Sequence, residues 1–317
     1  VAVDAGGIRA VKYGTTKNWV LGLEVVLPTG EVMWTGSKTF KCVSGYDLTR
    51  LFVGSEGTLG VFTKILLKVH PLPEARYCLM GFFPDLETAA TCVSRIIASG
   101  LDVSAAEFLD RTTMDALSRF AGFSFPEKAN ASLLIDVDGT EVAAKHNLKR
   151  VEETFRQHKV LDTWVALTER EAERLWGVRK GAAPALASIK PICKIEDPVV
   201  PISKLPKLVE GIRKIAEKYG VVIATFGHFG DGNAHPNILV DYRVPEEVKN
   251  AEKAAEEIYR LALNLGGSLT AEHGIGLAKA KWFNRERSSK FIDVMRAIKR
   301  SLDPNNILNP GKAGLWG

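Results

Sequence analysis

The chain has 317 residues, of which 46% are hydrophobic and 25% charged, a composition typical of a globular protein large enough for two hydrophobic cores. Its 42 basic and 37 acidic residues give a net charge of +5 and are spread along the sequence, which argues against a nucleic-acid partner. No apolar run approaches the roughly 20 residues that span a bilayer, and the first residues lack the pattern of a signal peptide. We therefore expect a cytoplasmic protein.

Four cysteines, Cys42, Cys78, Cys92 and Cys193, show no C-x-x-C spacing. This spacing argues against an iron–sulfur cluster or a zinc ribbon held by this chain alone, and we expect buried thiols. The sequence opens without an initiator Met in a loop of small residues, DAGGIRAVKYG. We interpret this opening as that of a fragment or a subunit.

The first part of the chain predicts antiparallel sheet. Residues 19–35 contain two runs of strand-forming residues around Pro28-Thr29-Gly30, which is a hairpin signal. Prolines 71 and 73 lie near the end of the run KILLKVHPLPE, and the residue pattern changes after it. These features indicate a domain boundary near residue 75.

Strand and helix patterns alternate beyond this boundary. We predict strands at 77–83, 104–110 and 131–139, and helices at 85–99, 112–121 and 140–158. The alternation predicts an α+β domain with a sheet covered by helices on one face.

The last third of the chain contains two further helix patterns. An amphipathic stripe closed by Gly266-Gly267 predicts a scaffold helix at 245–265 that packs on the sheet. A final helix is expected at about 289–302, before the irregular tail LDPNNILNPGK.

Two histidines lie in the glycine-rich stretch GHFGDGNAHPN, between strand patterns at 221–226 and 238–240. A glycine-rich turn can bring His228 and His235 together at the end of a sheet. The segment LTAEHGIG adds Glu272 and His273, so a His, His, Glu set becomes available for zinc or a similar divalent ion, with a position open for substrate. On spacing alone, ordinary hydrogen-bonding histidines remain an equal alternative.

A second glycine-rich stretch is VGSEGTLGVFT, residues 53–63. Gly54, Gly57 and Gly60 would allow the backbone to approach a phosphate or a dinucleotide closely. The stretch is neither a G-x-G-x-x-G fingerprint nor a P-loop, and a tight turn leading into a strand at 61–69 is the alternative.

Five motifs, DAGGIRAVKYG, VGSEGTLGVFT, GHFGDGNAHPN, AEHGIG and LDPNNILNPGK, occur in this order. In this respect the chain resembles the C-terminal two-thirds of the FAD-linked D-2-hydroxy acid dehydrogenases of the vanillyl-alcohol oxidase superfamily. That family includes D-lactate dehydrogenase, D-2-hydroxyglutarate dehydrogenase and the D subunit of glycolate oxidase. The resemblance implies an α+β fold in which residues 1–75 form the C-terminal part of a PCMH-type FAD-binding domain. Residues 76–317 then form the substrate (cap) domain, an antiparallel sheet covered by helices, and the tail 303–317 returns to the flavin.

The resemblance also implies site residues. The candidates for binding FAD are Gly6, Gly7, Gly14, Gly54, Glu56, Gly57, Gly60, Val61, Asn309 and Lys312. The implied ligands of a divalent metal, for which zinc is the expected ion, are His228, His235 and Glu272. The implied catalytic residues are His273 as the base, Arg179 and Lys194 as contacts of the substrate carboxylate, and Asn237 close by.

The activity implied is oxidation of a D-2-hydroxy acid to the 2-oxo acid, with hydride transfer to flavin N5. Ala183 stands where the glutarate-type enzymes carry a hydroxyl group, which favours D-lactate or glycolate. Asp4 replaces a usual asparagine near the cofactor.

The family's N-terminal FAD-binding portion has no counterpart here, so we expect a partner chain or fragment that supplies it. The other expected partner is an electron-acceptor protein or a quinone, through which the chain could also lie at a membrane. Two alternatives stay open: a non-catalytic or electron-transfer partner subunit of a flavoprotein complex, and a metal-dependent hydrolase.

Overall fold

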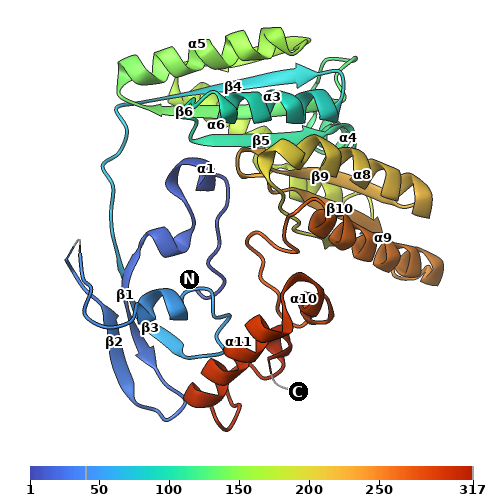
Figure 1. Ribbon diagram of the computed structural model, residues 1–317. Coiled ribbons are helices and arrows are strands. Elements are labelled where there is room, and N and C mark those ends of the chain that lie inside the picture. Colours follow the sequence, from blue (N-terminus) through green and yellow to red (C-terminus); the bar gives the residue numbers. More distant parts are fainter. Residues whose placement is uncertain (40, 316–317) are drawn as a thin grey trace. The chain divides into compact units, whose positions relative to one another are not determined.

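The computed structural model describes residues 1–39 and 41–315, which form two compact units (Figure 1). Unit 1 consists of Val1–Gly7, Tyr13–Pro71 and Leu269–Gly317, and unit 2 of Ile8–Lys12 and Leu72–Ser268. These units differ from the expected domains 1–75 and 76–317, because residues 269–302 also pack within unit 1.

Unit 1 contains a three-stranded antiparallel sheet in the order β2-β1-β3. The strands are β1 (Val20–Val26), β2 (Val32–Gly36) and β3 (Val61–Leu67). Leu27 N–H donates to the carbonyl of Glu31, and Gly30 takes a φ of +86°, which closes the turn between β1 and β2. The predicted hairpin is therefore confirmed.

Helices cover one side of this small sheet. Leu23 and Val25 of β1 form a core with Phe52, and Ile298 and Leu302 pack against it. The helices of unit 1 are α2 (Leu48–Phe52), α10 (Ala280–Glu286) and α11 (Ser289–Leu302), with 3-10 helices η1 (Thr16–Asn18) and η4 (Lys312–Gly314). The core thus joins the early strands to the last long helix of the chain.

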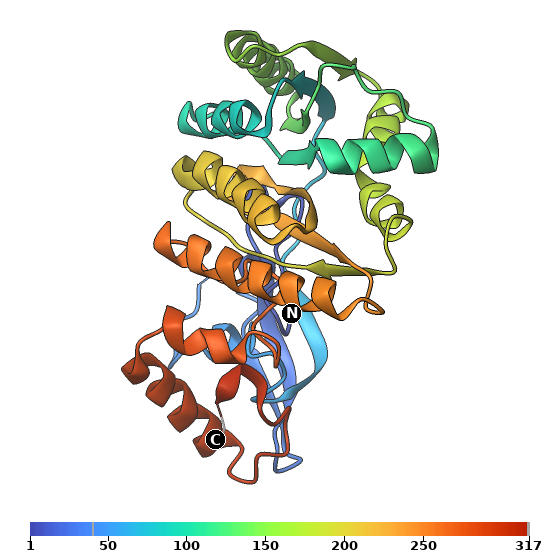
Figure 2. The same cartoon turned by 90° about the vertical axis from the view of Figure 1, so that its right-hand side faces the viewer.

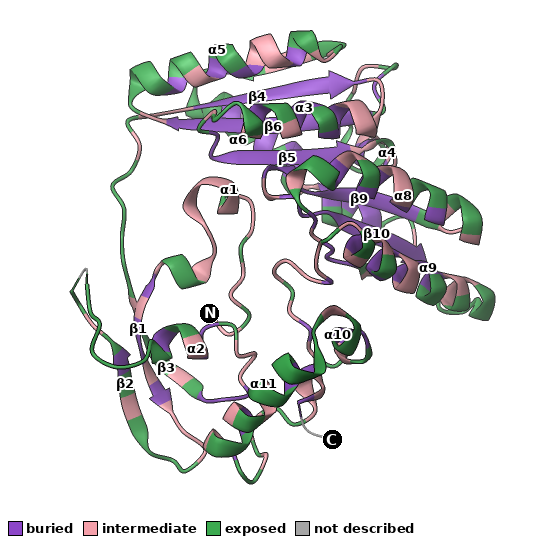
Figure 3. Ribbon diagram, in the orientation of Figure 1, coloured by how far each residue is buried: buried purple, intermediate pink, exposed green. Residues whose placement is uncertain are grey.

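Unit 2 is built on a seven-stranded antiparallel sheet in the order β7-β4-β6-β5-β9-β10-β8. Figure 2 shows helices on both sides of this sheet. The strands are β4 (Ala75–Phe83), β5 (Ala105–Asp110), β6 (Ala131–Gly139), β7 (Asp162–Ala166), β8 (Ile192–Ile195), β9 (Val222–His228) and β10 (His235–Val240). The central strands are buried along almost their whole length (Figure 3). Such strands must be covered on both faces.

The helices of unit 2 cover both faces of the sheet. They are α3 (Leu86–Ala98), α4 (Arg111–Ala121), α5 (Glu141–Gln157), α6 (Glu169–Lys180), α7 (Ala182–Ala187), α8 (Leu205–Tyr219) and α9 (Pro245–Asn264), with 3-10 helices η2 (Ile202–Lys204) and η3 (Phe229–Asp231). The chain passes from unit 2 to unit 1 within the short helix α1 (Ala10–Tyr13), between Lys12 and Tyr13.

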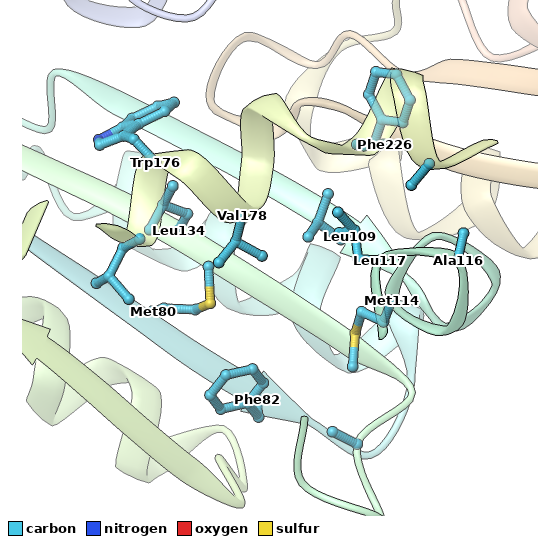
Figure 4. Close-up of a cluster of buried hydrophobic side chains, with 14 of the residues drawn as sticks. Met80, Phe82, Leu109, Met114, Ala116, Leu117, Leu134, Trp176, Val178 and Phe226 are labelled. Carbon is cyan, nitrogen blue, oxygen red and sulfur yellow. The ribbon is translucent and has the colours of Figure 1, made fainter. Parts of the chain in front are cut away.

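Alternate residues of β4 show the two layers. Met80 and Phe82 pack in a cluster with residues of α4, α6 and α7, among them Trp176 (Figure 4). Phe83 points to the opposite face, where its ring meets Phe155 of α5 at 5.2 Å between centroids. The prediction of helices on one face only was wrong, because strands buried on both faces carry no alternation that reveals the second layer.

Local capping explains several switches from strand to helix. Asp110 ends β5, and its carboxylate accepts the amide of Thr113 at the start of α4. Asp85 and Thr140 cap α3 and α5 in the same way. The predicted strand 131–139 and helix 289–302 match β6 and α11, and the helix at 245–265 matches α9 to within one residue.

The four cysteines differ in their exposure. Cys78 and Cys92 are buried as predicted and Cys193 is half-buried, but Cys42 is exposed, so the prediction was wrong for Cys42, which lies in a surface loop. Among the residues that the structure describes, no helix is both long and apolar enough to cross a membrane.

Candidate functional site

The two histidines of the glycine-rich stretch meet at the end of a hairpin. β9 ends at His228 and β10 begins at His235, and their ring centroids lie 5.0 Å apart with the planes at 87°. Both residues are buried, at 7% and 5% exposure. The convergence of the two imidazoles is thus present in the structure, and their role as metal ligands stays a prediction.

Sheet register places a third group, Glu107, against this pair. Glu107 of β5 is the direct partner of His228 across the β5–β9 ladder, and it is fully buried. Its Oε1 lies 2.5 Å from His228 Nδ1. Its Oε2 accepts from Arg179 of α6, 2.8 Å from Nε and 2.7 Å from Nη2. One carboxylate therefore links the candidate substrate-binding arginine to a candidate metal ligand.

The guanidinium of Arg179 is held on two sides. Its Nε and Nη2 face Glu107, and its carbon atom lies 4.5 Å from the centroid of the Phe226 ring. Only 10% of the side chain is exposed. A substrate carboxylate would therefore meet the guanidinium through Nη1 and the outer hydrogen of Nη2 rather than through the Nε edge.

A second carboxylate accompanies His235. Asp197 Oδ1 lies 3.4 Å from His235 Nδ1 and accepts a hydrogen bond of 2.9 Å from the side-chain Nδ2 of Asn233. Asp197 is fully buried. Nitrogen and carboxylate donors of this kind suit zinc and similar divalent ions, so the residues of unit 2 fit the predicted metal. Because Nδ1 of His228 faces Glu107, an ion would be bound through its Nε2.

Lys194 and Asn237 occupy neighbouring positions in unit 2. Lys194 lies on β8 beside Ile238 of β10, and its Nζ lies 3.7 Å from Oε1 of buried Glu196. Tyr259 donates a short hydrogen bond to the same carboxylate. Burial and the negative charge of Glu196 raise the pKa of the Tyr259 hydroxyl, so it acts as a donor.

Asn237 is buried, and both ends of its carboxamide already have partners. Its Nδ2 donates 2.6 Å to the carbonyl of His235, and its Oδ1 accepts from the Cys193 thiol at 3.2 Å. The structure therefore gives Asn237 a part in shaping the start of β10, where His235 lies.

The other predicted site residues belong to unit 1, where Glu56 joins several of their segments. Its carboxylate accepts the amides of Ile275 and Gly276 at 2.7 and 2.8 Å. Its carbonyl accepts from Asn309 Nδ2 at 2.7 Å, and its amide donates to Ala2. The loops predicted to bind FAD thus converge on one residue. Glu272 and His273 lie in the same segment as Ile275, with their ligand atoms within 4.8 Å of each other.

The space around the glycines of unit 1 shows which of these loops have room for a bound group. A side chain at Gly7 or Gly54 would meet atoms only at 3.7 Å or 3.4 Å, and both residues have positive φ. These two positions therefore fit a backbone that approaches a bound group. At Gly60, by contrast, Val25 is 2.4 Å from the position of an added Cβ, so packing within the core already explains that glycine.

The remaining candidates for FAD binding also differ in how much space surrounds them. The side chains of Asn18 and Asn309 fill the space beside Gly14 and Gly57, at 2.4 and 2.5 Å from the position of an added Cβ. Gly6 is exposed, Val61 at the start of β3 is 52% exposed, and Lys312 opens η4. Their contact with FAD stays a prediction.

Sequence patterns missed the buried carboxylates of unit 2. Glu107 is the single charge inside the run SAAEFL, and an ionised residue within an apolar strand was the available signal. Glu196 and Asp197 precede Pro198 in KIEDP, which has no periodicity to distinguish it from a loop.

Comparison with known proteins places this chain. Residues 72–313 match the family "FAD linked oxidases, C-terminal domain". The chain belongs to this family. It is 42% identical over 309 residues to glycolate oxidase subunit GlcD of Bacillus subtilis, covering 98% of this chain and 66% of that protein. It is 36% identical over 316 residues to a probable mitochondrial D-lactate dehydrogenase of Danio rerio, covering 98% of this chain and 63% of that one.

The fold of this FAD-linked oxidase chain also has counterparts among solved structures. It matches p-cresol methylhydroxylase with bound substrate at a TM-score of 0.78 and 20% identity, covering 99% of this chain and 68% of that one. The expected α+β fold of the PCMH type is therefore confirmed by this likeness, and the expected kinship with FAD-linked oxidases is confirmed by the family match over residues 72–313. The chain spans just under two thirds of the length of the two relatives above.

Proposed function

We propose that this chain oxidises a D-2-hydroxy acid to the 2-oxo acid with FAD, and that D-lactate or glycolate is the substrate. The observation that carries the proposal is the buried linkage of Arg179, Glu107 and His228, which places a carboxylate-binding cation beside a candidate metal ligand. Relatives named as a glycolate oxidase subunit and a D-lactate dehydrogenase support the same class of substrate.

The charges of unit 2 suit binding of an α-hydroxy acid. Arg179 would bind the substrate carboxylate through its remaining guanidinium N–H groups, and Lys194 would add a second positive charge. Burial of Arg179 keeps water from competing for the same donors. Ala183, an exposed residue of α7, offers no hydroxyl group, in keeping with a small acid.

The proton of the substrate hydroxyl requires a base. We propose His273 as this base, with a ring nitrogen accepting the proton. General-base help of this kind is typically worth roughly two to four powers of ten in rate. His228 and His235, with Glu272 as the third proposed ligand, would hold a divalent ion, most simply zinc. A bound ion would lower the pKa of the substrate hydroxyl, and bound FAD would supply the hydride acceptor.

The proposed partners follow from the length of the relatives. A polypeptide corresponding to the rest of those proteins would complete the FAD site that the loops around Glu56 begin. The electron acceptor would be a protein or a quinone.

The test is an anaerobic visible spectrum of the purified chain with FAD, zinc and the N-terminal partner portion, before and after D-lactate or glycolate is added. The flavin band should bleach. It should bleach much more slowly in His273→Ala, with FAD still bound, and chelation should abolish the reaction until zinc is restored. An unbleached flavin with both acids would contradict the proposal, and binding of zinc without FAD would favour the metal-dependent hydrolase.

A further inference from the structure

We propose that Glu107 is a positioning residue that fixes the tautomer of His228 and the orientation of Arg179 at the same time. The inference rests on the proposed function for its catalytic consequence, because that function gives the arginine and the histidine their roles. The geometry itself lies entirely within unit 2.

The first step is the burial of the carboxylate. Glu107 has no exposed surface, and its neighbours on β5, Ala106 and Phe108, are also buried. A carboxylate in such a position is stable only where cations or N–H groups satisfy both oxygens. Here Oε2 accepts a hydrogen bond from the Arg179 guanidinium, and Oε1 pairs with the His228 imidazole.

The second step is the proton on the imidazole. An ionised carboxylate only accepts hydrogen bonds, so the 2.5 Å contact between Oε1 and His228 Nδ1 requires a proton on Nδ1. In the neutral ring Nε2 then carries the lone pair. A histidine whose other nitrogen donates to a carboxylate is the arrangement that orients metal ligands and makes them more basic.

The third step is the pairing of the two partners. Both Arg179 and His228 present donors to Glu107, which only an acceptor with two oxygens can satisfy. In Glu107→Gln, one end of the amide becomes a donor. If that end faces His228, it favours a lone pair on Nδ1 and a proton on Nε2, which blocks metal binding there. If it faces Arg179, two donors oppose each other and the guanidinium must move.

The protein offers a matched control. Asp136 on β6 is equally buried, and its carboxylate also takes an arginine and a ring N–H, from Arg76 at 2.6 Å and Trp176 at 2.9 Å. Asp136→Asn therefore places a neutral amide in the same sheet, at a carboxylate whose described partners are Arg76 and Trp176 rather than His228 or Arg179.

The first experiment is nitrogen NMR of the full chain labelled with ¹⁵N-histidine, at a pH well above the ordinary histidine pKa. Six histidines give a countable spectrum, and His228→Gln assigns the ring in question. We expect the neutral tautomer with the proton on Nδ1. A proton on Nε2, or on both nitrogens, would overturn the proposal.

The second experiment measures zinc affinity by competition with a chelating dye. Glu107→Gln should weaken zinc binding by roughly 10- to 100-fold, the usual effect of losing such a partner, and Asp136→Asn should not. Equal losses in both variants would reduce Glu107 to a structural role and overturn the proposal.

Kinetics of the loaded enzyme separate this proposal from the proposed function. Glu107→Gln should raise KM for the hydroxy acid through the displaced arginine. If the wild-type protein oxidises no hydroxy acid, the proposed function fails, while the tautomer and the zinc affinity still decide the role of Glu107.

Discussion

Lys299 is a buried cation that holds two of the predicted cofactor segments together in unit 1. Its Nζ donates to the carbonyls of Thr58 and Leu308, at 2.9 and 2.8 Å, and to Asp303. Burial alone would raise the pKa of Asp303, but hydrogen bonds from Lys299 and from the amides of Leu308 and Ile307 outweigh it, so the pKa is lowered.

Lys299→Met should therefore destabilise the protein by about 3–5 kcal/mol, because it leaves the Asp303 carboxylate buried without its cation. Urea unfolding measures the loss. In a double-mutant cycle, Lys299→Met combined with Asp303→Leu should cost less than the sum of the single changes. Additive losses would show that the two side chains act independently.

Residue-level prediction from sequence succeeded where glycine marks a turn. The stretch GHFGDGNAHPN indicated that His228 and His235 converge, and the structure brings their rings to 5.0 Å. Glu107 and Lys299 were not found. Both partners of Glu107, and the Thr58 partner of Lys299, lie more than 70 positions away in sequence, and only the register or the packing of distant elements brings them together.

At the scale of elements, the hairpin β9–β10 depends on Gly227. This residue has φ +154°, and an added Cβ would lie 2.9 Å from the carbonyl oxygen of Asn233 and 3.0 Å from the amide of His235. Both obstacles are backbone atoms, so they cannot move aside as a flexible side chain could.

Gly227→Ala should destabilise unit 2 by roughly 2 kcal/mol or more and shift the His228 resonances in the NMR spectrum. Gly220→Ala is the matched control: it also has positive φ, but nothing lies within 4 Å of the added carbon, so it should cost only about 1 kcal/mol. If both changes had the same effect, close approach at Gly227 would not matter.

Asp110 makes the junction of β5 and α4 sensitive to pH. Burial raises its pKa to about 6, although hydrogen bonds from Thr113 and Thr225 oppose the shift. It also lines a cavity of about 830 Å³ that contains none of the predicted site residues. Since the folded pKa exceeds the unfolded value, the protonated form stabilises the fold below pH 4, and that contribution disappears as pH rises through about 6.

The advantage of wild type over Asp110→Asn should therefore shrink by up to about 3 kcal/mol between a pH below 4 and a pH above 6. Urea unfolding of both proteins at the two pH values tests this. A difference that grows with pH would mean that the folded pKa lies below the unfolded one.

Element prediction was most accurate where one face of a helix is solvated. The stripe at 245–265 predicted α9, and the pattern before the proline-rich tail predicted α11 with its bounds. Helices α6, α7 and α8 were not assigned. The helix predicted at 112–121 is α4, but the second layer that α4 forms with α6 and α7 was missed, because that layer packs on strands whose residues are apolar on both faces.

At the scale of the whole molecule, neither unit is a continuous piece of chain. Residues 8–12 belong to unit 2, although the residues before and after them belong to unit 1. Lys12 fixes this short segment through Asp138 and Asp102, both at 2.7 Å, and Asp138 is buried.

Lys12→Met should cost about 2 kcal/mol in urea unfolding and increase hydrogen exchange in residues 8–12, because Asp138 loses its nearest cation. The control Lys145→Met removes an exposed pair with Glu141 and should cost well under 1 kcal/mol. Unchanged exchange in Lys12→Met would show that apolar packing alone holds the segment.

The division of unit 1 has a consequence for synthesis of the protein. Strands β1 to β3 leave the ribosome before any of the seven strands of unit 2, yet Ile298 and Leu302, which pack on their core, leave after all of them. Unit 2 can therefore complete its fold on the nascent chain while the small sheet still lacks its covering helix. During that interval the apolar strands of unit 1 are the part of the chain most in need of a chaperone.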